Sequence, residues 1–239
     1  LYKRTGGTSE QAVAQAQAQM IERFGRSPSY VVSCAGVAPA GSLLTSPVKM
    51  FTRAFDINAA ANVVLAQAFL PAMISNNHGH FMTVASSASY FSLPNLCAYS
   101  MSKTAALAFL ESLRAELRAV YKACRVRTSV VTPTKVRTVL AEGLNEGDDD
   151  FLMPVLEPIQ VARAMADTLN SGLSRNISLP LGSALLPYLR ALPEWYRGAL
   201  RAMGNTDALV TPDSISRGQQ ALRGHQSNLD HMKKLGVHS

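Results

Sequence analysis

The stretch HFMTVASSASYFSLPNLCAYSMSKTAALAFLESL, residues 80–113, joins a short apolar run to a much longer helical pattern. The run HFMTVAS at 80–86 has the length of a buried strand, and the residues from about 98 to 121 carry the period of a helix. A second apolar run, VRTSVVT at 126–132, follows that helix. Strand, long helix and strand in this order indicate a βαβ unit with two parallel strands.

The same alternation extends along the chain in both directions. Thr8 to Gln11 fits a capping box, T-x-x-Q, which opens a helix that should end at Gly25. Repeated units of this kind predict an α/β fold, a Rossmann-like doubly wound parallel sheet with helices on both faces. The further expected elements are the strand YVVSCAG at 30–36, the helical segment from 46 to about 74, the helix at 158–172 and the strand NISLP at 176–180.

Composition and charge narrow the class of protein. With 239 residues, 47% of them hydrophobic, the chain has enough apolar material for one sizeable domain. The net charge of +7 comes from dispersed lysines and arginines without an aromatic-studded cluster, which argues against a nucleic-acid partner. The cysteines at 34, 97 and 124 form no zinc spacing, so we expect a reducing compartment and no metal. The first residues, LYKRTGGTSE, resemble neither a signal peptide nor an anchor, so any membrane contact is expected to be peripheral.

The strand and helix alternation ends near residue 182. This divides the chain into a domain at 1–182, a helical segment at 183–213 and a polar tail at 214–239. The middle segment, LLPYLRALPEWYRGALRAM, combines leucines, Trp195 and Tyr196 with three arginines. One interpretation places it in a membrane interface with its basic face outward. The other is a helix that closes over a substrate cleft or packs on the body of the domain.

Tyr99 and Lys103 stand four positions apart, just ahead of the apolar run TAALAFLESL. This spacing puts both side chains on one face of a helix, one turn apart. A phenol titrates near pH 10 unless its surroundings favour the phenolate, and a nearby ammonium does so. The pair therefore suits acid and base chemistry, although the spacing alone also fits an ordinary helix start.

Ser86 ends the predicted strand at 80–86, thirteen residues before Tyr99. The carboxyl ends of parallel strands face the crevice in which open α/β sheets bind ligands. A hydroxyl there can reach the same substrate oxygen as Tyr99. The alternative for Ser86 is a local cap at the end of the strand.

Five motifs in this order resemble the classical short-chain dehydrogenases/reductases. They are SCAG at 33–36, Asn58 in FDINAAANVV, Ser86 in TVASSA, Tyr99 and Lys103 in YSMSK, and PTKVRT at 133–138. The stretches LAQAFLPAM and NHGHFMTVAS look most like the branch that contains retinol dehydrogenases and 17β-hydroxysteroid dehydrogenases. The resemblance covers residues 8 to 182 well and LRALPEWYRGALRAMG more loosely.

This resemblance implies an NAD- or NADP-dependent oxidoreductase of a lipophilic alcohol, aldehyde or ketone, such as a retinoid, a steroid or a long-chain compound. Tyr99 is then the general acid and base, and Ser86 holds the substrate oxygen. Lys103 lowers the pKa of the tyrosine and binds the nicotinamide ribose, and Asn58 anchors a water that connects the lysine to solvent. Thr138 meets the carboxamide of the cofactor. The cofactor-binding residues implied are Ser33, Ala35, Gly36, Tyr99, Lys103, Pro133, Val136 and Thr138.

Other polar residues have simpler explanations. Asn58 taken alone is typical of a helix residue with local backbone bonds. His78 and His80, two apart at a turn, favour a structural role over a metal site. The run from Asp148 to Asp150 reads as a solvated loop, although by the resemblance it lies in a mobile substrate lid.

The sequence also departs from the family pattern. The family's first strand leads into a glycine-rich turn that receives the pyrophosphate, whereas TGG at 5–7 has no strand before it. We expect about two βαβ units of the family pattern to be missing, which predicts an N-terminally truncated sheet and leaves the YVVSC strand as an exposed apolar edge. Ser33 and Cys34 replace an asparagine pair, and Thr134 replaces a glycine beside the nicotinamide.

Two hypotheses follow from these features. The first is an active oxidoreductase of lipophilic alcohols or ketones. The second is a remnant unable to hold the dinucleotide that serves as a binding or dimerisation module. We expect a homodimer through the two long helices, and a location on the cytoplasmic side of the endoplasmic reticulum membrane or on lipid droplets.

Overall fold

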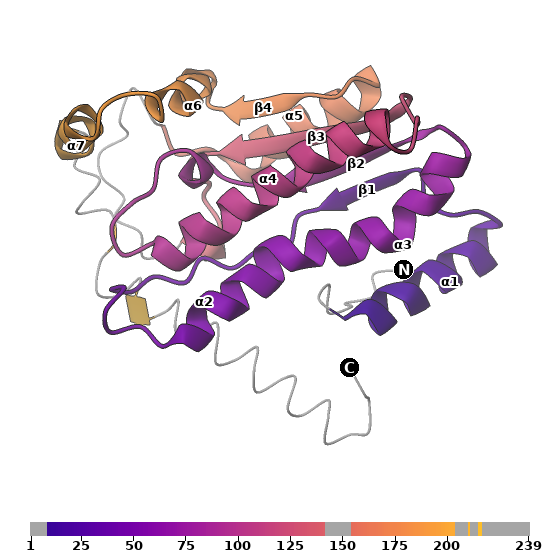
Figure 1. Ribbon diagram of the computed structural model, residues 1–239, viewed down its shortest axis with the longest axis horizontal. Helices are drawn as coiled ribbons and strands as arrows, with labels where there is room; N and C mark the ends of the chain where they lie inside the picture. Colours follow the sequence, from indigo (N-terminus) through magenta and orange to yellow (C-terminus); the bar gives the residue numbers. More distant parts are fainter. Residues whose placement is uncertain (1–8, 142–153, 204–209, 211–214, 217–239) are drawn as a thin grey trace.

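The computed structural model describes residues 9–141, 154–203, 210 and 215–216. The predicted loop Asp148–Asp150 and residues 217–239 of the predicted tail lie outside the described residues. Figure 1 shows a parallel sheet whose four strands lie side by side in chain order. The strands are β1 (Tyr30–Ser33), β2 (Gly79–Val84), β3 (Val126–Pro133) and β4 (Asn176–Leu179).

The register of the sheet aligns the carboxyl ends of the strands. Tyr30 pairs with His80, and Gly79 pairs with Val126. Parallel pairing throughout confirms the predicted α/β class. Within the described residues β1 pairs only with β2, and Tyr30 and Val32 are 55% and 40% exposed. The predicted apolar edge is therefore present at β1.

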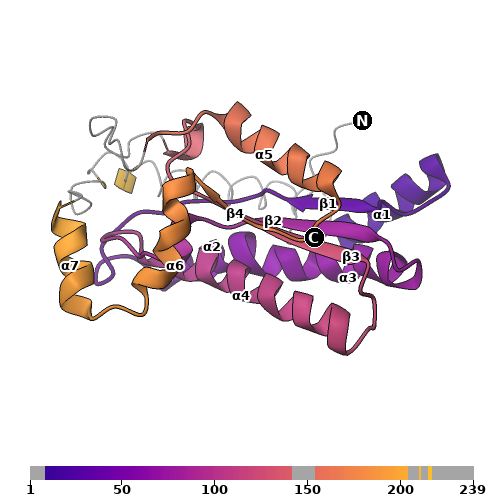
Figure 2. The ribbon, with the colours of Figure 1, turned by 90° about the horizontal axis from the view of Figure 1, so that it is seen from above.

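Helices cover both faces of this sheet. Figure 2 shows α2, α3 and α4 on one face and α5 on the other. Helix α4 joins β2 to β3, and α5 joins β3 to β4 in the same direction across the sheet but on the opposite face. The two connections therefore have opposite hands, so one of them departs from the usual right-handed crossover. The helices are α1 (Glu10–Phe24), α2 (Val48–Phe55), α3 (Ala61–Ser75), α4 (Cys97–Ala119) and α5 (Pro158–Ser171).

The main hydrophobic core lies between the sheet and the layer of α3 and α4. Phe81 of β2 is completely buried, and Leu110 of α4 is 1% exposed. The Phe81 ring meets the ring of Phe109 edge to face at a centroid distance of 6.1 Å. Val13 brings α1 into the same cluster, where α1 packs against α3. This layer fixes the position of the amino-terminal end of α4, which carries Tyr99 and Lys103.

Ser9, and not Thr8, is the N-cap of α1. Its hydroxyl accepts a hydrogen bond from the amide of Ala12 at 3.2 Å. The predicted capping box at Thr8 is thus wrong by one residue, because serine and threonine are both good caps and neighbour each other here. The predicted end at Gly25 is confirmed, with a left-handed φ of 70°.

The helical segment from 46 to 74 is not one regular helix. A π-helical turn, η1 (Asp56–Ala60), separates α2 from α3. The span Val48–Ser75 is long and apolar enough to cross a membrane, but half of its most apolar window is buried inside the protein. Because this span packs against α1, α4 and β2, its apolar composition is that of a core helix.

After β4 the chain forms three short elements at the carboxyl end of the sheet. They are η4 (Leu181–Leu185), α6 (Leu186–Leu189) and α7 (Glu194–Met203). In α7 an arginine faces the body of the protein, since Arg201 places its guanidinium over the ring of Phe91 at 5.0 Å. Arg197 and Glu194 form an ion pair beside it.

His80 is a buried polar residue in the middle of the sheet, 1% exposed. Its Nε2 lies 2.9 Å from the hydroxyl of Ser129, which accepts a hydrogen bond from the amide of Arg175. A serine hydroxyl can accept two hydrogen bonds and donate one, so Ser129 can serve Nε2 in either neutral tautomer of the imidazole. Burial, followed by the charge of Arg127, lowers the pKa of His80.

This pKa shift makes stability depend on pH. The unfolded chain takes up a proton near pH 6.5, whereas folded His80 stays neutral to a lower pH. The contribution of His80 is thus complete above pH 6.5 and is lost as the pH falls below it, by at most about 1.4 kcal/mol per pH unit. Urea unfolding of His80→Gln should show a weaker loss between pH 7.5 and 5.5 than the wild type. The exposed His78→Gln serves as the control, and an unchanged pH slope in His80→Gln would contradict this pKa shift.

Candidate active site

Ser86 and Tyr99 lie together at the carboxyl end of β2. The hydroxyl of Ser86 is hydrogen-bonded to the phenol of Tyr99 and also accepts the amide of Ala88 at 3.1 Å, where it caps the short helix η2 (Ser87–Ser89). The predicted local cap is therefore present, and contact of Ser86 with a substrate oxygen stays a prediction. The residue is 6% exposed.

The surroundings of Tyr99 are mainly apolar. Its ring packs against a small cluster of Ala40, Leu96 and Val210. Burial raises the pKa of the Tyr99 phenol, and the hydrogen bond with Ser86 opposes this only in part. This differs from the expectation that Lys103 lowers the pKa. The reason is that the phenol lies among apolar side chains while the lysine is directed to a different partner.

Lys103 is 3% exposed and lies one turn after Tyr99 in α4. Its Nζ donates a hydrogen bond to the carbonyl oxygen of Val84, the last residue of β2, at 2.8 Å. Burial lowers the pKa of this ammonium to about 8, and the nearby Cys34 opposes the shift. A buried ammonium with only one protein acceptor keeps further N–H groups for a ligand.

Gly36 makes room for this ammonium. A Cβ at this position would lie 3.2 Å from Nζ of Lys103 and 3.3 Å from Oδ1 of Asn58. Such distances are tighter than ordinary carbon contacts. The last residue of the SCAG motif is therefore small because the Lys103 ammonium occupies the space of its side chain.

Asn58 joins the loop after β1 to the catalytic helix. It sits in the π-helical turn, where its Oδ1 accepts the amide of Val37 at 2.9 Å and its Nδ2 donates to the carbonyl of Val37 at 2.8 Å. The same Nδ2 donates to the hydroxyl of Ser102 at 2.8 Å. The Asn58 side chain thus holds the backbone of Val37 and the hydroxyl of Ser102, which makes Asn58 a positioning residue.

Ser102 is a member of the site that the sequence analysis does not predict. It is 1% exposed, and its hydroxyl donates to the carbonyl oxygen of Tyr99 at 2.8 Å while it accepts from Asn58. A serine directly before Lys103, on the face of α4 that turns toward Asn58, is the available signal. Its chemistry resembles a helix-internal back-bond, so sequence alone does not distinguish it.

The remaining predicted cofactor residues lie at the ends of β1 and β3 and in the segments that follow these strands. Ser33 ends β1 and is 6% exposed, Ala35 follows it, and Pro133 ends β3. Val136 forms an isolated parallel bridge with Leu156.

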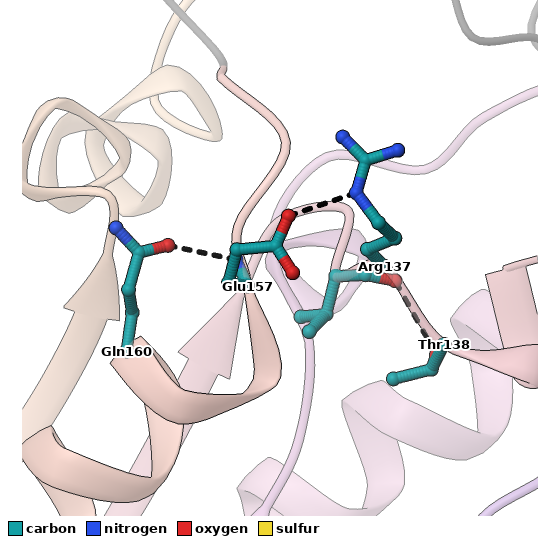
Figure 3. Close-up of polar contacts among 5 residues, drawn as sticks. Arg137, Thr138, Glu157 and Gln160 are labelled. Carbon is teal, nitrogen blue, oxygen red and sulfur yellow. Dashed lines mark hydrogen bonds and ion pairs between the residues drawn. The ribbon is translucent and has the colours of Figure 1, made fainter.

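Thr138 is exposed, and its hydroxyl donates to the carbonyl of Val136 at 3.3 Å (Figure 3). An ion pair of 2.8 Å between Arg137 and Glu157 fastens this loop to the start of α5, and Gln160 completes the cap there. Both charged side chains are about half exposed, so the pair orders the loop more than it stabilises the fold. Thr138 is not brought to Tyr99 by any contact among the described residues.

The residues at the centre fit the nicotinamide half of a dinucleotide. Nζ of Lys103 keeps N–H groups beyond its bond to Val84, and Oγ1 of Thr134 is buried without a hydrogen-bond partner in the described part of the chain. An amide group can satisfy such a hydroxyl. No group of three His, Cys, Asp or Glu side chains able to hold a metal occurs among the residues described.

The contact between Gly36 and Lys103 gives a testable result. In Gly36→Ala the new methyl deepens the burial of the ammonium, and we expect the titration midpoint of Lys103 to fall below about 8. NMR of lysine labelled at the ε-carbon measures this midpoint directly. Gly198→Ala, where a Cβ meets open space, is the matched control. An unshifted midpoint in Gly36→Ala would show that this glycine does not shape the lysine site.

Sequence comparisons identify proteins similar to this chain. Dehydrogenase RED3 of Cochliobolus heterostrophus is 39% identical over 54% of this chain and 65% of its own length. Estradiol 17-beta-dehydrogenase 11 of Pongo abelii is 37% identical over 72% of this chain and 56% of its own. Epidermal retinol dehydrogenase 2 of Mus musculus is 35% identical over 59% and 45%. The matched region thus spans about half the length of these relatives.

The family model described as short chain dehydrogenase matches residues 4–149. This range contains α1, the first three strands and all four predicted catalytic residues. With that match, and with relatives that include an estradiol dehydrogenase and a retinol dehydrogenase, the chain belongs to the short-chain dehydrogenase/reductase family, in the branch of these enzymes.

Proposed function

We propose that this protein is an NAD- or NADP-dependent oxidoreductase that interconverts an alcohol and a ketone or aldehyde on a lipophilic molecule. The observation that carries the proposal is the hydrogen bond between Ser86 and the buried phenol of Tyr99, one helical turn from the buried Lys103. This arrangement presents two hydroxyls to one further oxygen atom. Family membership supports the oxidoreductase class.

A bound nicotinamide would supply or accept a hydride, and side chains of the protein would donate or accept the proton. Because burial raises its pKa, Tyr99 keeps its proton at neutral pH and is in the state that donates to a carbonyl oxygen. Ser86 holds that oxygen within reach of the phenol. Lys103, fixed by the carbonyl of Val84, would offer its remaining N–H groups to the ribose. Asn58 fixes the loop at Val37 and, through Ser102, the first turn of α4; its anchoring of a water remains a prediction.

The apolar surroundings of Tyr99 support a lipophilic substrate. Ala40, Leu96 and Val210 are buried beside the ring, and Leu93 and Ile215 pack against them. Apolar side chains around two hydroxyls fit a molecule that is hydrocarbon except for one oxygen function. The names of two relatives refer to estradiol and to retinol, which are molecules of this kind.

The predicted partners and location are part of the same proposal. Exposed apolar side chains on α2, α3 and α4, namely Val48, Phe55, Val63 and Met101, support a homodimer through the long helices. A lipophilic substrate supports a location at the cytoplasmic side of the endoplasmic reticulum membrane or at lipid droplets. The reducing surroundings expected for the three free cysteines are compatible with that side.

One observation favours the alternative, a protein that keeps the catalytic residues without holding the dinucleotide. In the described residues α1 leads directly into β1, and no glycine-rich turn precedes that strand. The phosphate site of such folds lies at a helix that follows a turn of this kind. The 239-residue chain should therefore bind NADH and NADPH far more weakly than a family member that carries this turn. Isothermal titration calorimetry checks this, and micromolar binding would contradict it and remove the alternative.

Replacing Tyr99 tests the proposed chemistry. We expect Tyr99→Phe to lower turnover of retinol or estradiol by about a hundredfold to ten-thousandfold, since the acid and base is removed while the ring remains. Cofactor binding should change little. Tyr121→Phe, at the far end of α4, is the matched control. Activity retained in Tyr99→Phe would exclude this residue as the acid and base, whereas an inactive wild type that fails to bind cofactor would support the alternative.

A further inference from the structure

The region after β4 exposes a set of large apolar side chains. Tyr188 of α6 is 72% exposed and Trp195 of α7 is 74% exposed. These exposures are high for aromatic side chains, which proteins usually bury. We call the set the α6–α7 apolar surface, and its members are Leu181, Leu185, Tyr188, Leu192, Trp195 and Met203, which are between 37% and 85% exposed.

Helix α7 packs on the protein by its charged side. The Nε of Arg201 donates to the carbonyl of Ser92 at 3.3 Å, and the guanidinium covers the ring of Phe91. Arg201 also binds Glu194 at 2.9 Å, and Arg197 pairs with the same carboxylate. No residue of α7 is buried. Amphipathic helices ordinarily turn their apolar side to the core, so the opposite arrangement leaves that side for a partner outside this fold.

This surface borders the candidate active site. Phe91 and Ser92 belong to the segment that follows Ser86, so their contacts with Arg201 place α7 beside that segment. Figures 1 and 2 both show α6 and α7 at the end of the sheet to which the strand arrows point. The carboxyl ends of the strands carry the site, so the apolar surface lies at its border.

The chemistry of this surface matches a lipid interface. Tryptophan and tyrosine favour the boundary between headgroups and acyl chains, and leucines supply apolar area below it. Arg190, at the carboxyl end of α6, is exposed, and the net charge of the protein is +7. Cationic groups around an apolar patch complement anionic lipid headgroups.

From these observations we infer that the α6–α7 apolar surface docks the protein on a phospholipid surface that contains anionic lipid. The apolar side of α7 enters the headgroup boundary, while Arg197 and Arg201 remain bound to the protein. Taken with the proposed function, this docking lets a lipophilic substrate pass from the lipid toward Tyr99 without crossing water. The docking itself does not depend on catalysis and is tested without it.

Trp195 is the only tryptophan of the chain, so its fluorescence reports on this surface alone. The full chain is titrated with vesicles of phosphatidylcholine, and with vesicles of about 70% phosphatidylcholine and 30% phosphatidylserine. We expect a blue shift of the emission and quenching by brominated acyl chains with the mixed vesicles, and weaker binding to phosphatidylcholine alone. High salt should weaken the binding.

Two matched double variants locate the contact. Leu185→Ser with Tyr188→Ser should lower the vesicle partition coefficient by at least about tenfold, since two apolar side chains no longer enter the lipid. Leu173→Ser with Tyr121→Ser removes a leucine and a tyrosine that are 51% and 47% exposed elsewhere, and should change it by less than about twofold. Circular dichroism checks that both variants stay folded.

Three results would overturn the inference. The first is an unshifted Trp195 emission at saturating mixed vesicles. The second is an equal loss of binding in both double variants. The third is a lipid-free dimer in sedimentation that Leu185→Ser with Tyr188→Ser dissociates, because the surface then binds a second copy. None of these depends on turnover, so a chain without oxidoreductase activity can still pass the test.

Discussion

The burial of one ammonium group, that of Lys103, is the constraint on which the site depends. Placing a charge in a protein interior costs several kcal/mol unless polar groups receive it. Here the carbonyl of Val84 at the end of β2 accepts a hydrogen bond, and the missing side chain of Gly36 leaves the space. The pKa of about 8 shows that the compensation is incomplete. The ammonium therefore gains by meeting an oxygen-rich ligand.

The backbone around this ammonium is held by a second set of contacts. Asn58 binds both polar groups of Val37 as a neighbouring strand would, although no strand lies there. Asn62 in turn donates to the carbonyl oxygens of Asn58 and Ala59, and its own Oδ1 accepts from Thr83 of β2. The π-helical turn frees carbonyl groups that a regular helix would use itself. The irregularity is thus what lets a helix serve as a clamp for the loop that carries Gly36.

Much of the fold can be predicted from the periodicity of the sequence, and the features that cannot be predicted in this way have physical causes. The strand at 80–86 and the helix from 98 are found within about two residues because the change of period is abrupt. The π-helical turn is not predicted, because it keeps the apolar pattern of the surrounding helices. The identity of Ser102 as a partner of Asn58 depends on a contact across 44 positions, which no local pattern encodes. Burial raises the pKa of Tyr99, and the cluster around its ring includes Ala40 and Val210, which are far from it in the sequence; the spacing of Tyr99 and Lys103 therefore does not predict the direction of the shift.

Helix α7, at the surface beside the candidate site, is another element whose packing the sequence alone does not predict. Its sequence indicates amphipathicity, but not which side faces the protein. The body offers Phe91 and the free carbonyl of Ser92, and an arginine satisfies both at once through cation–π stacking and a hydrogen bond. A leucine in that place could cover the Phe91 ring but would form neither interaction. The side of α7 that carries Arg201 therefore packs on the segment after Ser86, and Trp195 is left exposed.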